Sequence, residues 1–145
     1  MAVVRDLLAR KGTDVVSIAP TATVLDAARL MNDRSVGGVL VVDADNQLLG
    51  IFTERDILRR VVAADLPPAT TKLSDVFTRS VVTCGPDTTV EECGALMSAR
   101  RVRHLPVIDA RGLLGVVTIG DLLAHTVSEH ETTIQHLNSY VFDVR

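Results

Sequence analysis

Apolar and polar residues follow two different periods along this chain, and the same order of periods occurs twice. Short, largely β-branched runs at 15–18 and 81–84 end close to Pro20 and Pro86, and proline is a natural strand terminator. Two further apolar runs follow in each copy, separated by short Asp-containing turns that predict hairpins. The paired runs are 38–42 with 48–52 and 105–108 with 113–117.

A helix is predicted between the first strand and the hairpin of each copy. Thr23 with Asp26, and Thr89 with Glu92, have the spacing of a capping box, in which a hydroxyl and a carboxylate satisfy free helix N–H groups. Apolar residues then recur at helical spacing and predict a buried face. The members of this face are Val24, Ala27, Ala28 and Met31 in the first copy, and Val90, Cys93, Gly94 and Met97 in the second.

The two copies are one unit written twice. A shift of 66 positions aligns 15–44 with 81–110, and a deletion of one residue then aligns 48–58 with 113–123, so that 18 of 41 positions are identical. A second helix follows each hairpin, which gives the order β-α-β-β-α in each repeat. Neither repeat is large enough to bury its sheet alone. The predicted fold class is therefore α/β (α+β), with the two repeats packed on each other.

The repeats leave three further segments. The amphipathic start predicts a leader helix, and the end of the chain predicts a helical tail that packs on a partner subunit, because Ile134, Leu137 and Val141 recur at helical spacing. The expected organisation is a leader helix at 1–14, repeat 1 at 15–64, a linker with a helical segment at 65–80, repeat 2 at 81–128, and the tail at 129–145.

Composition limits the class of protein. The chain has 145 residues, 47% hydrophobic content and a formal charge of −3, which suits a globular domain and argues against a nucleic-acid partner. Its apolar runs are far shorter than the roughly 18 residues of a membrane-spanning helix. The first residues mix charged and apolar side chains, unlike a secretory signal, and only two cysteines occur. These features predict a cytoplasmic protein without a membrane segment.

No catalytic or metal motif is found. Cys84 aligns with Ile18, and Cys93 with Ala27, so both cysteines are predicted to be small buried residues, with a redox or metal pair as the minority alternative. The histidines show no metal-ligand spacing, and neither a nucleophile elbow nor a Gly-rich phosphate loop is present. We expect neither an enzyme nor a metal protein.

Thr53 and Asp56, and their counterparts Thr118 and Asp121, stand where a strand is predicted to end and a helix to begin. The same spacing forms the two capping boxes described above, so a purely structural cap is one interpretation. The other is a ligand site. A helix N-terminus and a threonine hydroxyl suit a phosphate, and a carboxylate suits the vicinal hydroxyls of a ribose.

The repeat also resembles a known family. "GIFTERDI" and "GVVTIGDL", each of the form G-h-h-T-x-x-D with h apolar, together with "RHLPVID" at 103–109, are similar to a pair of cystathionine-β-synthase-type (CBS) domains, also called a Bateman module, over 15–128. The resemblance implies a pseudo-twofold pair with two clefts, which hold AMP, ADP, ATP, NAD or S-adenosylmethionine in many members. It also implies association into a homodimer.

The resemblance implies roles for particular residues. Asp56 and Asp121 would bind ribose, and Thr53 and Thr118 would hold phosphate or nearby ribose oxygens. The adenine base would lie against backbone groups of the first strands, around Val16, Ser17, Ile18, Val82, Thr83 and Cys84.

Basic residues distinguish the two repeats. Arg103 and His104 fall where some family members place phosphate-binding residues, and they replace Gly37 and Gly38 of the first repeat. A guanidinium grips phosphate bidentately, which a glycine cannot do. Arg55 of the first repeat becomes a glycine in the second, so we expect two inequivalent clefts.

Three other basic residues admit a simpler interpretation. Lys72 in the linker is long enough to reach a phosphate, but an exposed lysine needs no such role. Arg100 and Arg101 are interpreted as a solvated helix end, where cations complement the helix dipole.

The sequence therefore predicts a regulatory protein that binds an adenine nucleotide between its repeats and acts on a protein target that remains to be identified. AMP is the first choice, because one carboxylate and one phosphate locus match a mononucleotide. NAD is second, with ADP, ATP and S-adenosylmethionine as further alternatives, and no cofactor is required. The rival is a structural dimerisation or interaction module without a ligand.

Overall fold

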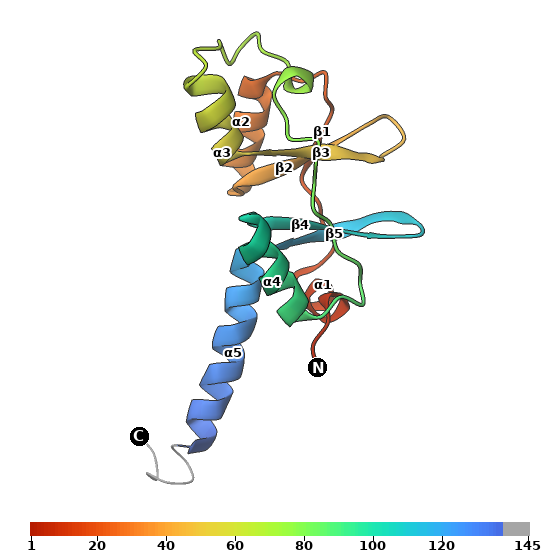
Figure 1. The fold of residues 1–145 in the computed structure, drawn as a ribbon, viewed down its shortest axis with the longest axis vertical. Coiled ribbons are helices and arrows are strands. Elements are labelled where there is room, and N and C mark those ends of the chain that lie inside the picture. Colours follow the sequence, from red (N-terminus) through yellow and green to blue (C-terminus); the bar gives the residue numbers. More distant parts are fainter. Residues whose placement is uncertain (138–145) are drawn as a thin grey trace.

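The computed structural model describes the backbone of residues 1–137 and the side chains of residues 1–131. The two repeats are stacked along the long axis of the molecule, with their hairpins extending to one side and most of their helices lying on the other (Figure 1). Over the described residues, no helix has the length and apolar character that crossing a membrane requires. Val141, which the sequence assigns to a helical tail, lies outside the described residues.

Repeat 1 forms a three-stranded sheet with the order β1-β2-β3. β1 is parallel to β2, and β2 is antiparallel to β3, so the predicted hairpin is confirmed. A short α3 follows β3 directly and continues as the π-helical segment η1. The elements are β1 (Ser17–Ile18), α2 (Val24–Arg34), β2 (Gly38–Val42), β3 (Leu48–Thr53), α3 (Glu54–Asp56) and η1 (Ile57–Val62).

Repeat 2 has the same order, with a shorter first strand. Its elements are α4 (Val90–Arg100), β4 (His104–Asp109), β5 (Gly112–Thr118) and α5 (Ile119–Leu137). The strand predicted at 81–84 is reduced to one parallel bridge between Cys84 and Val107. Only the Cys84 N–H and carbonyl bond to β4, to Pro106 and Ile108, before the chain turns at Pro86. The tail predicted from residue 129 continues α5 without a break as far as Leu137.

Both predicted capping boxes are present. The Thr23 hydroxyl accepts a hydrogen bond from the Asp26 N–H at 3.1 Å, and the Asp26 carboxylate accepts one from the Thr23 N–H at 3.0 Å. Thr89 and Glu92 repeat this arrangement at 3.0 and 3.1 Å. Such a reciprocal cap satisfies two of the free N–H groups at a helix start, which fixes where α2 and α4 begin.

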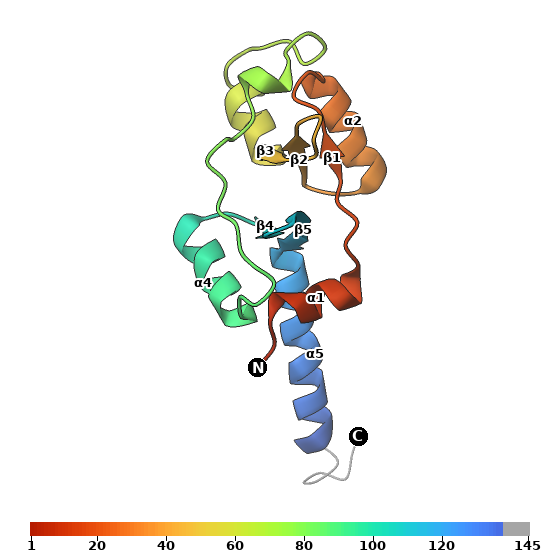
Figure 2. The same ribbon diagram turned by 90° about the vertical axis from the view of Figure 1, so that its right-hand side faces the viewer.

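The leader helix packs on repeat 2, and the linker packs on repeat 1. α1 (Val4–Lys11) docks on repeat 2, where the Val4 N–H donates to the Thr88 carbonyl at 2.8 Å. The linker docks on repeat 1, where the Leu73 N–H, at the start of the 3-10 helix η2 (Leu73–Asp75), donates to the Ala22 carbonyl at 2.9 Å. Thr88 and Ala22 occupy equivalent repeat positions, so each repeat is completed by the segment that precedes the other. α1 packs against β5, and Figure 2 shows it lying with the elements of repeat 2.

Each repeat has a separate apolar core that includes its docked segment. The core of repeat 1 contains Leu73, Val76 and Phe77 of the linker, and the core of repeat 2 contains Val4, Leu7 and Leu8 of α1. Of the predicted helix faces, Val24, Ala27, Met31, Cys93 and Met97 are buried, whereas Ala28, Val90 and Gly94 are only partly buried. Cys84 and Cys93 are buried free cysteines. A hydrogen bond between the two thiols and burial raise the pKa of Cys84.

Candidate ligand site between the repeats

Both T-x-x-D motifs cap their own helices. The Thr53 N–H donates to the Asp56 carboxylate at 3.0 Å, and the Thr118 N–H donates to the Asp121 carboxylate at 2.8 Å. The threonine hydroxyls accept the return hydrogen bonds from the Asp56 and Asp121 N–H groups at 3.4 and 3.2 Å. Each aspartate accepts its cap hydrogen bond at Oδ2, so Oδ1 can accept hydrogen bonds from other groups.

The surroundings of Asp56 engage its second oxygen. The Thr78 hydroxyl donates to Asp56 Oδ1 at 2.9 Å, and Arg60 Nε lies 3.5 Å from the same atom. The side chain is only 10% exposed. Asp56 therefore connects β3, η1 and the docked linker inside repeat 1.

The surroundings of Asp121 differ in charge and in access. Lys11 Nζ, at the end of α1, donates to Asp121 Oδ2 at 2.7 Å and to the Val116 carbonyl at 2.9 Å. The Asp121 side chain is 21% exposed, and its Oδ1 accepts no hydrogen bond from the described part of the chain. Asp121 thus has an acceptor atom available that Asp56 lacks.

A cavity of about 560 Å³ lies between the repeats, close to the starts of α3 and α5. This volume falls within the range of small-molecule sites. The wall from repeat 1 comes from α3 and η1, and the wall from repeat 2 comes from the end of α4, the segment before β4 and the start of α5. Its lining residues are Arg55, Arg59, Met97, Ser98, Arg100, Arg101, Val102, Arg103 and Ile119.

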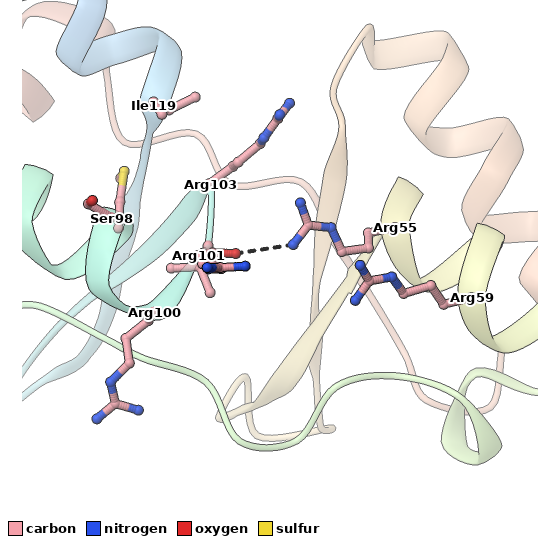
Figure 3. A pocket seen from close by; sticks show the side chains of 9 residues that line it. Arg55, Arg59, Ser98, Arg100, Arg101, Arg103 and Ile119 are labelled. Carbon is pink, nitrogen blue, oxygen red and sulfur yellow. Dashed lines mark hydrogen bonds between the residues drawn. The ribbon is translucent and has the colours of Figure 1, made fainter.

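Arginine side chains give this cavity its charge. Arg55 and Arg59 extend from repeat 1 toward Arg101, whereas Arg100 extends away from them (Figure 3). The Arg55 Nη1 donates to the Arg101 carbonyl at 3.2 Å, which links the two repeats. Within the described residues, none of the five lining arginines forms an ion pair with a carboxylate. Such a concentration of unneutralised guanidinium groups favours an anion, and above all a phosphate.

His104 lies where the two repeats meet. A Cβ atom at Gly38 would be 3.3 Å from His104 Nε2, so the glycine leaves the space that the imidazole occupies. Burial is the main cause that lowers the pKa of His104, and the charge of Lys11 is the next. Glu54 and Asp121 act in the opposite direction, and Arg103 acts with Lys11. The neutral imidazole is therefore the favoured form at the contact between repeats.

The structure separates the predicted site residues into groups. Arg55 and Arg103 line the cavity, and His104 lies at the contact between repeats. Lys72 forms an isolated antiparallel β-bridge with Thr23, just before α2, and does not line the cavity. Among the first-strand residues, Val16, Ser17, Ile18, Val82 and Thr83 are at least partly accessible, and Cys84 is buried.

Three lining arginines were not assigned to a site from the sequence. Arg59 stands four residues after Arg55, a spacing that places both on one face of a helix. Arg100 and Arg101, interpreted above as a solvated helix end, also line the cavity, and Arg101 caps α4 with a φ of 55°. The basic run "RRVR" at 100–103 was the feature of the sequence that could have indicated that Arg100 and Arg101 belong to the site.

Comparison with known proteins agrees with this arrangement. The sequence profile described as the CBS domain matches residues 4–63 and 73–128, which include both repeats. The chain belongs to the CBS domain family. The matched regions also include the whole of α1 and the linker from Leu73, the segments that complete each core.

Two relatives are similar over most of this CBS-domain chain. It is 39% identical over 123 residues to the mitochondrial CBS domain-containing protein CBSX3 of Arabidopsis thaliana, covering 82% of this chain but only 60% of that protein. It is 33% identical over 131 residues to the CBS domain-containing protein YhcV of Bacillus subtilis, covering 87% of this chain and 92% of that one.

Solved structures confirm the fold of the CBS pair. A CBS-domain-containing protein of Agrobacterium tumefaciens matches with a TM-score of 0.80 and 36% identity, covering 86% of this chain and 98% of that one. The CBS domain pair of protein MJ0100, solved in complex with 5′-methylthioadenosine and S-adenosyl-L-methionine, matches with a TM-score of 0.79 at 23% identity, covering 89% and 98% of the two chains. The predicted tandem CBS fold is therefore confirmed.

Proposed function

We propose that this CBS pair is a regulatory adenine-nucleotide sensor, with AMP as the preferred ligand and no catalytic activity of its own. The observation that carries the proposal is the cavity between the repeats, where arginines from both repeats have no carboxylate partner among the described residues. A phosphate group would neutralise this charge and accept hydrogen bonds from it.

The nucleoside part of the ligand is inferred from the neighbouring acceptors. Ile119 lines the cavity and stands two residues before Asp121, whose Oδ1 is available to a ribose hydroxyl. Arg55 lines the same cavity one residue before Asp56. The MJ0100 CBS pair, which shares the fold, binds adenosyl compounds, and this agrees with a nucleoside ligand. AMP combines one ribose with one phosphate and matches this set of groups.

The proposed mechanism is a population shift. The cavity wall comes from both repeats, so a ligand that contacts Arg55 and Arg101 together stabilises one arrangement of the repeats over others. The protein target would recognise the surface of that arrangement. NAD is the second candidate ligand, because the lining arginines provide donors for a second phosphate.

The rival function is a structural interaction module without a ligand. The specific observation in its favour is that both T-x-x-D motifs form reciprocal helix caps, so each has a structural role without a nucleotide. The cluster of lining arginines argues against this rival, because like charges gathered without counter-charges destabilise the fold.

We also propose that two chains form a homodimer through their η1 and α5 helices. Leu58 and Val62 of η1 are each 62% exposed, and their repeat equivalents Leu123 and Val127 of α5 are 60% and 51% exposed. A second copy offers the same stripes. The two exposed apolar pairs, Leu58 with Val62 and Leu123 with Val127, can pack against those of a second copy about a twofold axis.

A thermal-shift panel tests the proposed ligand class. The panel consists of AMP, ADP, ATP, NAD and S-adenosylmethionine, with inorganic phosphate as the control for a simple anion. A ligand at about 100 times its Kd adds roughly 2.7 kcal/mol to the free energy of unfolding, which raises the Tm by several degrees. When every ligand is present at the same concentration, we expect the largest shift with AMP, because the shift then follows affinity. No shift with any nucleotide would favour the structural module.

A further inference from the structure

The two T-x-x-D aspartates are held by different partners at matching places. In repeat 1, the backbone N–H of Thr78 donates to the Ile51 carbonyl at 2.9 Å, and its hydroxyl donates to Asp56 at 2.9 Å. In repeat 2, Lys11 Nζ alone makes both equivalent contacts, to the Val116 carbonyl at 2.9 Å and to Asp121 at 2.7 Å. Repeat 1 thus has a neutral hydroxyl where repeat 2 has a cation.

The Lys11 contact is easily exchanged. The side chains of Lys11 and Asp121 are 29% and 21% exposed, and an ion pair in such a partly solvated position contributes little net free energy. The ammonium group sits on the flexible four-carbon stem of a lysine side chain. Lys11 is also the last residue of α1, and the chain turns directly after it at Gly12, with a φ of 92°. Thr78, by contrast, is fixed by its backbone hydrogen bonds with Ile51.

Lys11 also lies near the arginine-lined cavity. The charges of Lys11, Asp121 and Arg103 all act on the imidazole of His104, which lies at the contact between the repeats. Arg103 is one of the residues that line the cavity. Lys11 and Asp121 are not themselves lining residues, but Ile119, which lines the cavity at the start of α5, stands two residues before Asp121.

We propose that Lys11 binds the phosphate of the nucleotide that engages Asp121. The inference rests on the proposed function, since it requires a nucleotide between the repeats. On binding, ribose hydroxyls take the place of Lys11 at the Asp121 carboxylate, and the Lys11 ammonium turns to the phosphate. The exchange keeps the carboxylate hydrogen-bonded and places a cation between two anionic groups that otherwise repel each other.

This role predicts a specificity that a structural lysine does not give. Lys11 distinguishes AMP from adenosine, because only AMP carries the phosphate that the ammonium binds. A charge-assisted hydrogen bond of this kind corresponds to about a tenfold change in affinity or more. Since α1 carries Lys11, the leader helix also becomes part of the ligand site of repeat 2.

The test compares the binding of AMP and adenosine by titration calorimetry to the wild type, Lys11→Met and Lys11→Arg. Arg5→Met is the matched control, because Arg5 forms the other ion pair of α1, with Asp87 at 2.7 Å, and both side chains of that pair are exposed. We expect Lys11→Met to weaken AMP binding about tenfold, to leave adenosine binding unchanged, and to be largely rescued in Lys11→Arg.

Two other outcomes would overturn the inference in different ways. If the wild type binds AMP and Lys11→Met changes AMP and adenosine binding equally, or changes neither, Lys11 has no phosphate role while the proposed function survives. If the folded wild type binds neither compound, both proposals fail. The Tm of each variant shows whether it is folded, and Lys11→Gln replaces Lys11→Met if the latter is not.

Discussion

The imidazole of His104 lies against Gly38, the residue that holds the same position in the other repeat. A small residue in repeat 1 thus makes room for a large one in repeat 2, because a Cβ atom at Gly38 would lie 3.3 Å from the His104 ring. The contact joins the start of β2 to the start of β4, and Arg103, which precedes His104, lines the cavity. Substitutions at either residue therefore test how the repeats pack.

His104 predicts a pH dependence of stability. Its pKa in the folded state is lowered from the ordinary value of 6.5, mainly by burial, so the folded protein binds this proton less readily than the unfolded chain. Stability is then present above the ordinary pKa and is lost as the pH falls below it. We expect the Tm of the wild type to fall more between about pH 7.5 and about pH 5.5 than that of His104→Gln. An equal fall in both proteins would show that His104 does not contribute.

Substitution of Gly50 by alanine should cost far more stability than the same substitution at Gly115, its equivalent in repeat 2. A Cβ at Gly50 would overlap the Thr78 carbonyl oxygen, and backbone cannot move away easily, whereas a Cβ at Gly115 would meet only the flexible end of Leu8 at 3.0 Å. We expect Gly50→Ala to lower the free energy of unfolding by about 3 kcal/mol and Gly115→Ala by about 1 kcal/mol or less. Urea unfolding measures both. Equal losses would contradict the close docking of the linker.

Arg55 predicts a charge-dependent ligand affinity. Its guanidinium lines the cavity from repeat 1, so Arg55→Ala should weaken AMP binding about tenfold and reduce the dependence of binding on salt. Arg111→Ala is the control, because Arg111 is an exposed arginine that pairs with Asp109 in the hairpin turn of repeat 2. Similar losses in the two variants would show that general charge, and not the cavity, determines affinity.

The exposed stripes predict the effect of charge on assembly. We expect Leu58→Glu and Leu123→Glu each to shift the protein from dimer to monomer in analytical ultracentrifugation, because a carboxylate at the centre of an apolar contact is desolvated without a partner. Ala95→Glu, on the exposed part of α4, should leave the dimer intact. A wild-type protein that is monomeric at high concentration would contradict the proposed interface.

Local features were predictable from the sequence, because they depend on neighbouring residues. The caps at Thr23 and Thr89 and both hairpins are set by spacing within a few positions, and the repeat supplied an internal check on each. The shortened strand before Pro86 was overestimated, since an apolar run does not show how many of its residues find a partner strand.

Features that depend on distant contacts were not predictable in the same way. The exchange of α1 and the linker between repeats joins segments far apart in the chain, so no local pattern reveals that Lys11 meets Asp121 across 110 positions. The position of Arg101 at the end of a helix can be inferred from neighbouring residues, and it was therefore assigned to a solvated helix end. The contact that Arg55 makes with Arg101 from the other repeat depends on the tertiary structure and cannot be inferred in this way. The repeat pattern indicated candidate residues, of which Arg55 and Arg103 line the cavity, and only the tertiary structure shows that three further arginines join them.

Titration of the wild-type protein with AMP by isothermal calorimetry tests the central claim most directly. The cavity between the repeats presents five arginines, and phosphate binding there predicts a saturable heat that is lost progressively as salt is raised. The account predicts a Kd below about 1 mM at low salt. A folded protein that produces no saturable heat with AMP at that concentration would contradict it.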